Sequence, residues 1–252
     1  MGDFYQNGIV TTLHNLSQRG ADAVETELLR FSKEKRLGLI LPCLYSELET
    51  EAMPNIVKEL SHVPYLNQLI IGLDRATPEE YKKALLIFNK LPQNVRVLWN
   101  DGPRLRAVDQ RLKDAKLSTD QMGKGRNVWF CMGYALGSSQ ADAFAIHDCD
   151  ITTYERALLA RLLYPVAHPQ FNYEFCKGYY ARVASGKMNG RVTRLLVTPL
   201  LKTLKRIFGS SEYLDYLDSF RYPLAGEMSF SREVIKDLRI PSDWGLEIGI
   251  LS

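Results

Sequence analysis

Apolar and polar positions along the first 150 residues alternate in blocks that predict strands and helices in turn. Short apolar runs predict buried strands, and longer stretches with apolar residues at helical spacing predict helices. The predicted strands are 37–41, 69–73, 95–99 and 143–146, and the predicted helices are 21–34, 47–61, 78–90, 104–116 and 125–136. Pro42 is expected to end the first strand. This alternation predicts an α/β fold with a mostly parallel sheet and helices on both faces.

The pattern after residue 150 is less regular. The aromatic stretch 172–183 predicts an extended strand and 186–190 a turn, while the predicted helices are 192–201, 212–220 and 231–237. No repeat, low-complexity segment or linker separates the two parts. We therefore expect a single domain over 1–252 with two functional halves, about 37–150 and about 151–252.

Polar residues follow the ends of three predicted strands, at 42–47, 74–76 and 148–150. In open α/β sheets, ligands bind beyond the carboxyl ends of the strands. Asp148 and Asp150 follow a buried run at positions i and i+2, and their carboxylates could hold a hard divalent cation, Mg²⁺ or Mn²⁺. Because Asp-x-Asp is short and common, a surface turn is the alternative interpretation.

Two segments with glycine and basic residues precede predicted helices. In Gly123-Lys124-Gly125-Arg126, the glycines allow close backbone approach and the helix N-terminus favours an anion. Gly190-Arg191-Val192-Thr193 combines a guanidinium and a hydroxyl at a second helix start. A solvated loop and a surface arginine are the respective alternatives.

Three further groups of residues have two interpretations each. Alternation along the predicted strand places Lys177 and Tyr179 on one face and Tyr180 and Arg182 on the other. One interpretation is that one of these faces lines a cleft, and the other is that the strand is half-buried with its charged ends in solvent. Glu247, in a glycine-rich apolar setting, could bind a substrate hydroxyl or be an exposed acid of a short helix. His147 is expected to be packed and hydrogen-bonded rather than to bind metal.

Composition narrows the class of protein without identifying it. A hydrophobic content of 46% and a net charge of +3 are typical of a soluble globular protein, and this weak charge does not indicate nucleic acid binding. The four cysteines are widely spaced with no Cys-x-x-Cys pair, which argues against a zinc site or disulfides and favours a reducing cytosol. Neither a signal peptide nor a transmembrane run is evident, so a cytoplasmic location is expected.

The motifs, taken in order, resemble the glucosyl-3-phosphoglycerate synthase family and its mannosyl-3-phosphoglycerate synthase relatives. They are Leu-Pro-Cys-Leu-Tyr-Ser-Glu (41–47), Gly-Lys-Gly (123–125), Asp-Cys-Asp (148–150), Lys-Gly-Tyr-Tyr-Ala-Arg (177–182), Gly-Arg-Val-Thr-Arg-Leu (190–195), Tyr-Pro-Leu-Ala-Gly-Glu (222–227) and Gly-Leu-Glu-Ile-Gly (245–249). The resemblance covers roughly residues 37–252, and its last four motifs together are the more specific ones.

The resemblance implies a GT-A, Rossmann-like fold and a metal-dependent hexosyl transfer with retention of configuration. The implied donor is a nucleotide sugar, commonly UDP-glucose, and the implied acceptor is 3-phosphoglycerate or a similar small phosphorylated acid. The first half would then bind the nucleotide sugar and the second half the acceptor. Neither nucleic acid nor a membrane is an expected partner, and a homodimer is one expected assembly.

Site residues follow from the matching motifs. The implied donor-binding residues are Pro42, Leu44, Glu47, Lys124, Asp148, Leu224 and Gly226, and Asp74 joins them through its place at a strand end. The implied acceptor-binding residues are Gly190, Arg191 and Thr193. Asp150 is expected to be the main metal ligand with Asp148 beside it, and catalytic roles are expected for Glu247, Asp150 and Lys124.

The sequence departs from the family pattern in three places. Cys149 stands where the family usually has serine, and 71–76 lacks the usual acidic-serine-glycine pattern. The family continues beyond the Glu247 motif with a histidine that helps to bind the metal, whereas this sequence stops at Ser252. A truncated or degenerate sugar-nucleotide-binding domain without turnover is therefore one alternative. A sugar-phosphate nucleotidyltransferase is another, but it would need a glycine-rich, arginine-containing loop at 42–47.

Overall fold

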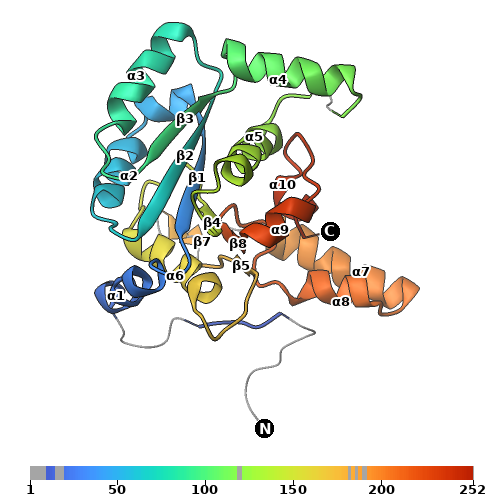
Figure 1. The fold of residues 1–252 in the computed structure, drawn as a ribbon. Coiled ribbons are helices and arrows are strands. Elements are labelled where there is room, and N and C mark those ends of the chain that lie inside the picture. Colours follow the sequence, from blue (N-terminus) through green and yellow to red (C-terminus); the bar gives the residue numbers. More distant parts are fainter. Residues whose placement is uncertain are drawn as a thin grey trace.

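In the computed structural model, the apolar runs of the first half form the centre of a six-stranded sheet with the order β3-β2-β1-β4-β8-β5 (Figure 1). The strands are β1 (Leu37–Leu44), β2 (Leu66–Asp74), β3 (Val95–Trp99), β4 (Ala143–Ile146), β5 (Phe175–Lys177) and β8 (Met228–Ser231). The first four are parallel, and β8 runs antiparallel to both β4 and β5. The structure describes residues 10–14, 20–117, 121–180, 183–184, 187–188 and 192–251.

Helices cover both faces of this sheet, as the sequence predicts (Figure 1). One face packs against α1 (Ala21–Phe31), α2 (Ala52–Ser61), α3 (Pro78–Phe88) and α6 (Arg156–Ala167). The other packs against α5 (Lys124–Ser138), α9 (Arg232–Asp237) and α10 (Leu246–Gly249). The remaining described elements are α4 (Pro103–Asp114), α7 (Thr198–Phe208), α8 (Glu212–Ser219), a 3-10 turn (Tyr45–Glu49), a π turn (Thr193–Val197), and the two-stranded β6 (Val183–Ala184) and β7 (Lys187–Met188).

The central strand β1 explains why its sequence is apolar without alternation. Leu39 and Leu41 belong to the core beneath α1 and α2, whereas Ile40 belongs to the core beneath α5. All three side chains are fully buried. Burial of each contributes about 1.5–3 kcal/mol relative to exposure, so this strand anchors both layers of helices.

The expectation that Pro42 ends the first strand is wrong, because β1 continues to Leu44. The Ile40 carbonyl accepts a hydrogen bond from the His147 amide, so the polar groups of Ile40 and Pro42, two residues apart, face β4. β4 ends at Ile146, which is paired with Ile40, so no residue of β4 pairs with Pro42 on that side. Pro42 has no amide hydrogen to donate, and none is needed there.

The predicted helix over 47–61 is divided in two. Local hydrogen bonds stabilise the 3-10 turn: Leu44 N donates to Glu47 Oε2 over 2.7 Å, and Thr50 Oγ1 donates to the Glu47 carbonyl over 2.7 Å. The α-helix begins only at Ala52.

The predicted strand over 172–183 is much shorter than expected. Its partner β8 offers only the register from Phe175 opposite Phe230 to Lys177 opposite Met228. The chain then leaves the strand at Gly178, whose amide donates to the Glu227 carbonyl over 2.9 Å. The sequence predicted neither the helix α6 nor the strand β8.

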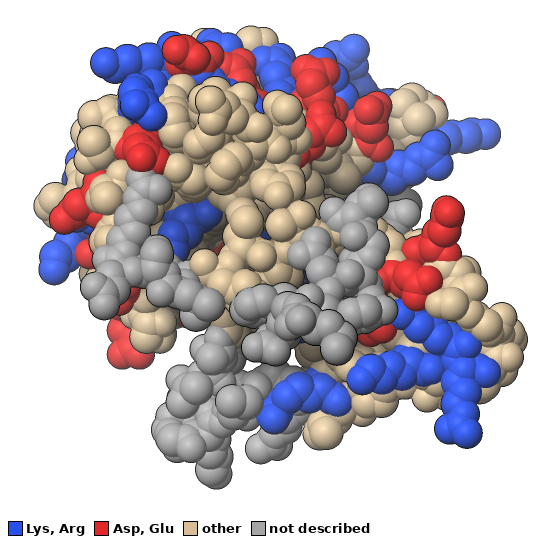
Figure 2. Space-filling view, turned by 90° about the horizontal axis from the view of Figure 1, so that it is seen from below, with Lys and Arg blue, Asp and Glu red and all other residues tan. Residues whose placement is uncertain are grey.

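The surface near α7 and α8 carries exposed charge. Figure 2 shows Lys and Arg side chains gathered on the side of the molecule where Figure 1 places α7 and α8. Acidic side chains are interspersed elsewhere on the same face (Figure 2).

None of the described helices is both long and apolar enough to cross a membrane.

Candidate active site

The ends of five strands meet at one edge of the sheet. β1, β2 and β4 are parallel, so the residues after them lie together, as the sequence predicts. β8 runs in the opposite direction and therefore begins at this edge, with Met228 opposite both Ile146 and Lys177. This topology places Glu227 and Lys177 beside the Asp148–Asp150 loop.

Lys124 lies at the centre of the cluster. Its ammonium contacts Asp148 Oδ1 at 2.6 Å and Glu247 Oε1 at 2.8 Å. Burial alone would lower the pKa of Lys124, but the charges and hydrogen bonds of Asp148 and Glu247 outweigh burial and raise it. Lys124 therefore remains charged and joins two chain segments that are distant in sequence.

Two further carboxyl groups of the cluster are partly or fully buried. Burial raises the pKa of Glu47, and the charges of Asp150 and Asp148 raise it further. Burial also raises the pKa of Glu227, although Tyr180 opposes this shift by donating a hydrogen bond to Glu227 Oε2 over 2.6 Å. The charge of Asp148 raises the pKa of both groups, and a cation near these carboxylates would offset that repulsion.

Lys177 is the second ammonium group of the site. Its Nζ donates to the Ala225 carbonyl over 2.8 Å. Burial lowers the pKa of Lys177 to about 8, while Glu247 and Glu227 oppose this shift and Lys124 adds to it. Lys177 thus changes charge near neutral pH, which an exposed lysine does not do.

The expected division of strand faces at 177–182 is wrong for the described residues. Lys177 and Tyr180 were expected on opposite faces, yet the pKa of Glu227 responds to Tyr180 and that of Lys177 to Glu227. The chain leaves the strand after Lys177, so alternation does not continue. Tyr179 instead contacts His14 Nδ1 through its hydroxyl at 2.9 Å, and Arg182 lies outside the described residues.

Gly226 permits the close approach of Asp148 to the loop before β8. A Cβ atom at this position would lie 2.4 Å from Asp148 Oδ2. The neighbouring Leu224 is half-buried in the same loop, and the Ala225 carbonyl binds Lys177. A glycine is therefore required here by packing around the carboxylate.

The glycines at 123–125 serve a different purpose from the expected one. The amides of Gly125 and Arg126 donate to the carbonyls of Asp243 and Ser242 over 3.2 and 2.9 Å. A Cβ on Gly125 would lie 1.8 Å from the Pro241 carbonyl oxygen. The expected anion site of backbone amides is thus occupied by the chain itself, and only the Lys124 side chain enters the cluster.

Arg126 also differs from the expectation of a phosphate-binding basic pair. Its Nη2 lies 3.7 Å from Asp74 Oδ1, and its Nη1 lies 3.9 Å from Asp109 Oδ2. Asp74 is buried, which raises its pKa, while Arg126 opposes the shift. Asp74 does end β2 at the expected edge, but its charged partner is Arg126 rather than Lys124.

The predicted acceptor residues are only partly described. Gly190 and Arg191 lie outside the described residues. Thr193 begins the π turn before α7 and is buried, and its Oγ1 has no hydrogen-bond partner among the described residues. A buried hydroxyl without a partner is costly, and this makes Thr193 a candidate for contact with a ligand.

The expectation for His147 is confirmed. The ring is fully buried, and Nδ1 lies 3.1 Å from the Tyr154 hydroxyl. Burial lowers the pKa of His147 to about 3. The histidine is therefore neutral and packed at the start of the Asp148–Asp150 loop.

The donor set of the cluster fits a hard divalent cation. The cluster holds five carboxyl groups and two ammonium groups. The carboxyl groups belong to Glu47, Asp148, Asp150, Glu227 and Glu247, and the ammonium groups to Lys124 and Lys177. Asp150 is exposed, and the Asp148 side chain is 30% exposed. Carboxylate oxygens that solvent can reach are the ligands preferred by Mg²⁺ and Mn²⁺.

A cavity of about 250 Å³ lies beside this cluster. It is lined by Lys177, Tyr179, Phe220 and Tyr222 among others, and also by residues 10–13. Neither Asp148 nor Lys124 lines it. The cavity therefore adjoins the carboxylate cluster at Lys177 but does not contain it.

The mixed sheet, with polar clusters beyond the ends of its parallel strands, is the arrangement expected of a GT-A fold. Solved structures of glucosyl-3-phosphoglycerate synthase from Mycobacterium tuberculosis share it, with a TM-score of 0.63 and 21% identity, over 95% of this chain and 70% of that chain. One is a complex with Mn²⁺, UDP and glucosyl-3-phosphoglycerate, another with Mn²⁺, UDP-glucose and phosphoglyceric acid. The predicted fold class is confirmed.

Curated relatives confirm the resemblance seen in the motifs. The chain is 49% identical over its whole length to a glucosyl-3-phosphoglycerate synthase of Persephonella marina, and 40% identical over 99% of its length to one of Methanococcoides burtonii. The chain spans 62% and 61% of the length of these two relatives. No family model matches the chain.

Sequence reasoning gave no role to Glu227, and it gave Lys177 and Tyr180 only as residues of a strand with one face that could line a cleft. Glu227 could have been found from the sequence, because it ends the matched motif 222–227. The role of Lys177 and Tyr180 depends on the antiparallel pairing of β5 with β8, which the sequence does not reveal.

Proposed function

We propose that this chain carries the substrate sites of a metal-dependent retaining glycosyltransferase that moves glucose from UDP-glucose to 3-phosphoglycerate. The support is its similarity over the whole chain to two glucosyl-3-phosphoglycerate synthases. The observation that carries the proposal is the contact of Lys124 with both Asp148 and Glu247 at the carboxyl edge of the sheet. These contacts bring together three of the matched motifs, 123–125, 148–150 and 245–249.

In this proposal, 37–150 binds the donor and 151–252 binds the acceptor, within one domain. Pro42, Leu44 and Glu47 lie at the end of β1 and would contact the base and ribose. Asp74 would complete the nucleotide side, and Leu224 and Gly226 would line the sugar. Glu247 would bind the hydroxyl groups of the donor sugar and so leave its contact with Lys124.

The charges of the site suit a departing diphosphate. Asp150, with Asp148 beside it, would hold Mg²⁺ or Mn²⁺, and the bound ion would stabilise the negative charge of the diphosphate. Lys124 would add its ammonium charge on the same side. A preorganised charge of this kind acts strongly because it costs no reorganisation during the reaction.

The acceptor would approach from the second half. Gly190, Arg191 and Thr193 would bind its phosphate or carboxylate, and the Thr193 hydroxyl, which has no partner among the described residues, supports this assignment. Lys177 would supply a second positive charge. The acceptor hydroxyl would attack the anomeric carbon on the face that the diphosphate leaves: the new carbon–oxygen bond forms, the bond to phosphate breaks, and the departing phosphate takes the proton.

The test is incubation of the chain with UDP-glucose, 3-phosphoglycerate and Mg²⁺ or Mn²⁺. We expect release of UDP together with a glucosylated acid, and no release when the metal is chelated. Calorimetric titration with UDP-glucose separates the alternatives: binding without release would indicate a sugar-nucleotide-binding domain without turnover. Absence of both binding and release would contradict the proposal. The cytoplasmic location and the homodimer stay predictions.

A further inference from the structure

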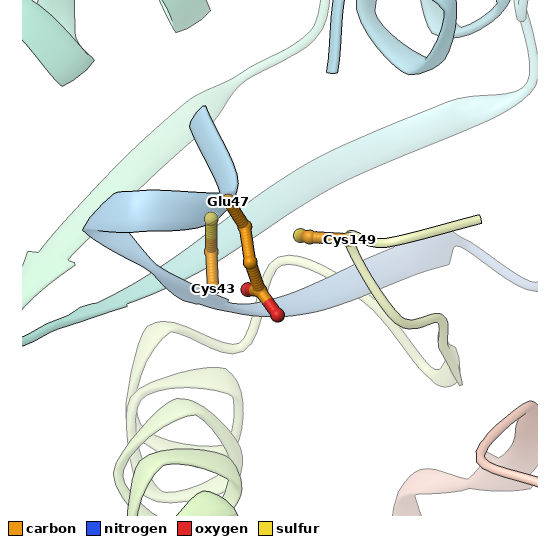
Figure 3. Close-up of side chains that lie close together, drawn as sticks. All are labelled: Cys43, Glu47 and Cys149. Atoms are coloured by element: carbon orange, nitrogen blue, oxygen red, sulfur yellow. The ribbon is translucent and has the colours of Figure 1, made fainter. Parts of the chain in front are cut away.

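Three side chains with metal-binding atoms lie close together beside the Asp148–Asp150 loop (Figure 3). They are Cys43 on β1, Glu47 on the 3-10 turn and Cys149 on the loop after β4. The two sulfur atoms and one carboxylate oxygen all lie within 4.8 Å of one another. Within the described part of the chain, this is the group of three His, Cys, Asp or Glu side chains whose ligand atoms all lie within that distance of one another.

Strand register, rather than spacing in the sequence, brings the two cysteines together. Ile40 on β1 pairs with Ile146 on β4. Cys43 and Cys149 each lie three residues further along, Cys43 within β1 and Cys149 in the loop after β4, and both belong to the core on the α1 and α2 face of the sheet. The sequence-based argument against a zinc site depended on spacing along the chain, which does not show this juxtaposition.

The surroundings of the group suit a bound ion. Both cysteines are free thiols and are only 1% exposed, so bulk water does not compete strongly for them. Glu47 is half-buried and offers a route from solvent. The Cys43 thiol now donates to the Leu44 carbonyl over 3.2 Å, and Leu44 N binds Glu47, so local hydrogen bonds hold the ligand atoms in place.

We propose that Cys43, Cys149 and Glu47 form a binding site for a borderline-soft divalent cation of the zinc class. Two thiolates and one carboxylate suit zinc and do not suit magnesium. Tetrahedral ligands at about 2.0–2.3 Å from zinc lie about 3–4 Å from one another, so small shifts complete the site. Each thiol loses its proton to solvent as its sulfur binds the ion, and the fourth position remains open to water.

The carboxylate distinguishes this site from a pair of cysteines that is ready to form a disulfide. A disulfide uses only the two sulfur atoms, and a third ligand close to both contributes nothing to it. The same carboxylate completes three protein ligands, which is the number found in zinc sites that keep one position open.

The site also has a consequence for turnover, and this part of the inference depends on the proposed function. Glu47 belongs to the proposed nucleotide contacts, and Cys149 lies between Asp148 and Asp150. An ion bound to Glu47 and Cys149 fixes the positions of the Glu47 side chain and of the Asp148–Asp150 loop, so Glu47 is no longer available to the nucleotide. Zinc is therefore expected to inhibit UDP release, with UDP-glucose competing against it.

The binding test needs no nucleotide and is independent of glycosyl transfer. Co²⁺ replaces zinc as a spectroscopic probe in titrations of the reduced protein. We expect one ion per chain, a thiolate-to-cobalt charge-transfer band, and displacement of Co²⁺ by Zn²⁺ but not by excess Mg²⁺. These results come from the unsubstituted protein, so they stand even if a variant fails to fold.

Substitutions then assign the ligands. Cys149→Ser should weaken Co²⁺ binding by at least about 100-fold, because loss of even an outer-shell partner costs 10–100-fold. Cys43→Ser should do the same, whereas Cys176→Ser removes a cysteine on β5 and should leave the band unchanged. Absence of the band, or its persistence in Cys149→Ser, would overturn the proposal. A covalent link between Cys43 and Cys149 in the air-exposed protein with no cobalt binding would also overturn it.

Discussion

The two halves of the described chain build one site by different means. In the first half, Glu47, Asp74 and Asp148 are positioned by the ends of parallel strands that are buried on both faces. In the second half, Lys177 and Glu227 are positioned by β5 and β8, which have three and four residues. The first arrangement follows from the register of a large core, and the second depends on a few individual contacts.

Exposure differs between the halves in the same direction. The core residues of β1 and β2 are fully buried, whereas α7 and the π turn before it leave large apolar side chains in solvent. These exposed side chains are Leu195, Leu196, Leu200, Ile207 and Phe208. Stability should therefore depend mainly on the first half, and substrate selectivity on the second.

The largest expected effect tests this division of stability. Ile40→Ala should lower the free energy of unfolding by about 2–5 kcal/mol, because it leaves a cavity between β1 and α5. Leu196→Ala, at a side chain that is 58% exposed, should change it by less than about 0.5 kcal/mol. Urea denaturation measures both values. Equal losses in the two variants would show that α7 is buried in solution.

The next effect concerns the exposed acid of the first half. Asp150→Ala should reduce metal-dependent UDP release by about 10²–10³-fold, the range for loss of one preorganised electrostatic contact. The free energy of unfolding should stay the same, because Asp150 is exposed. Asp237→Ala, at an exposed acid that ends α9, is the matched control. Unchanged release in Asp150→Ala would remove Asp150 from the metal site.

Much of the first half could be predicted from the sequence, because its strands are apolar runs whose burial needs no knowledge of partners. β3 and β4 have the predicted bounds. The parallel order then requires that the residues after β1, β2 and β4 lie together. Pro42 shows the limit of this reasoning: its tolerance within β1 depends on where β4 ends, which the local sequence does not show.

The second half could be predicted less well for a physical reason. β5 and β8 are too short for a clear alternating pattern, and their antiparallel pairing joins segments about 50 residues apart in the chain. That pairing decides that Lys177 and Glu227 meet. In the same way, the amides of Gly125 and Arg126 bind Asp243 and Ser242, so a local helix-start motif could not reveal that its anion site is filled.

A smaller effect tests the charge contributed by Lys177. Its pKa is lowered to about 8 by burial, so most of its positive charge is lost between pH 7 and pH 9, and the acceptor KM should rise about tenfold over this range. Because the folded pKa lies below that of the unfolded chain, this group makes the protein more stable as pH rises above about 8. Steady-state kinetics across this range measures the KM.

The matched variant for this test is Lys177→Arg, whose guanidinium stays charged throughout. Its KM should remain nearly constant between pH 7 and pH 9. If the variant shows the same rise as the unsubstituted protein, the titrating group lies elsewhere, in the substrate or in another residue.

The smallest effect concerns the unpartnered hydroxyl at the start of the π turn. Thr193→Val keeps the shape of the side chain, and the free energy of unfolding should stay the same or rise, because a buried hydroxyl without a described partner is removed. If Thr193 binds the acceptor, the acceptor KM should rise by about twofold to tenfold, which corresponds to one hydrogen bond of 0.5–1.5 kcal/mol. The KM for UDP-glucose should not change. A lower stability with both KM values unchanged would instead assign Thr193 to the packing of the second half, and the acceptor side would then depend on the residues before it.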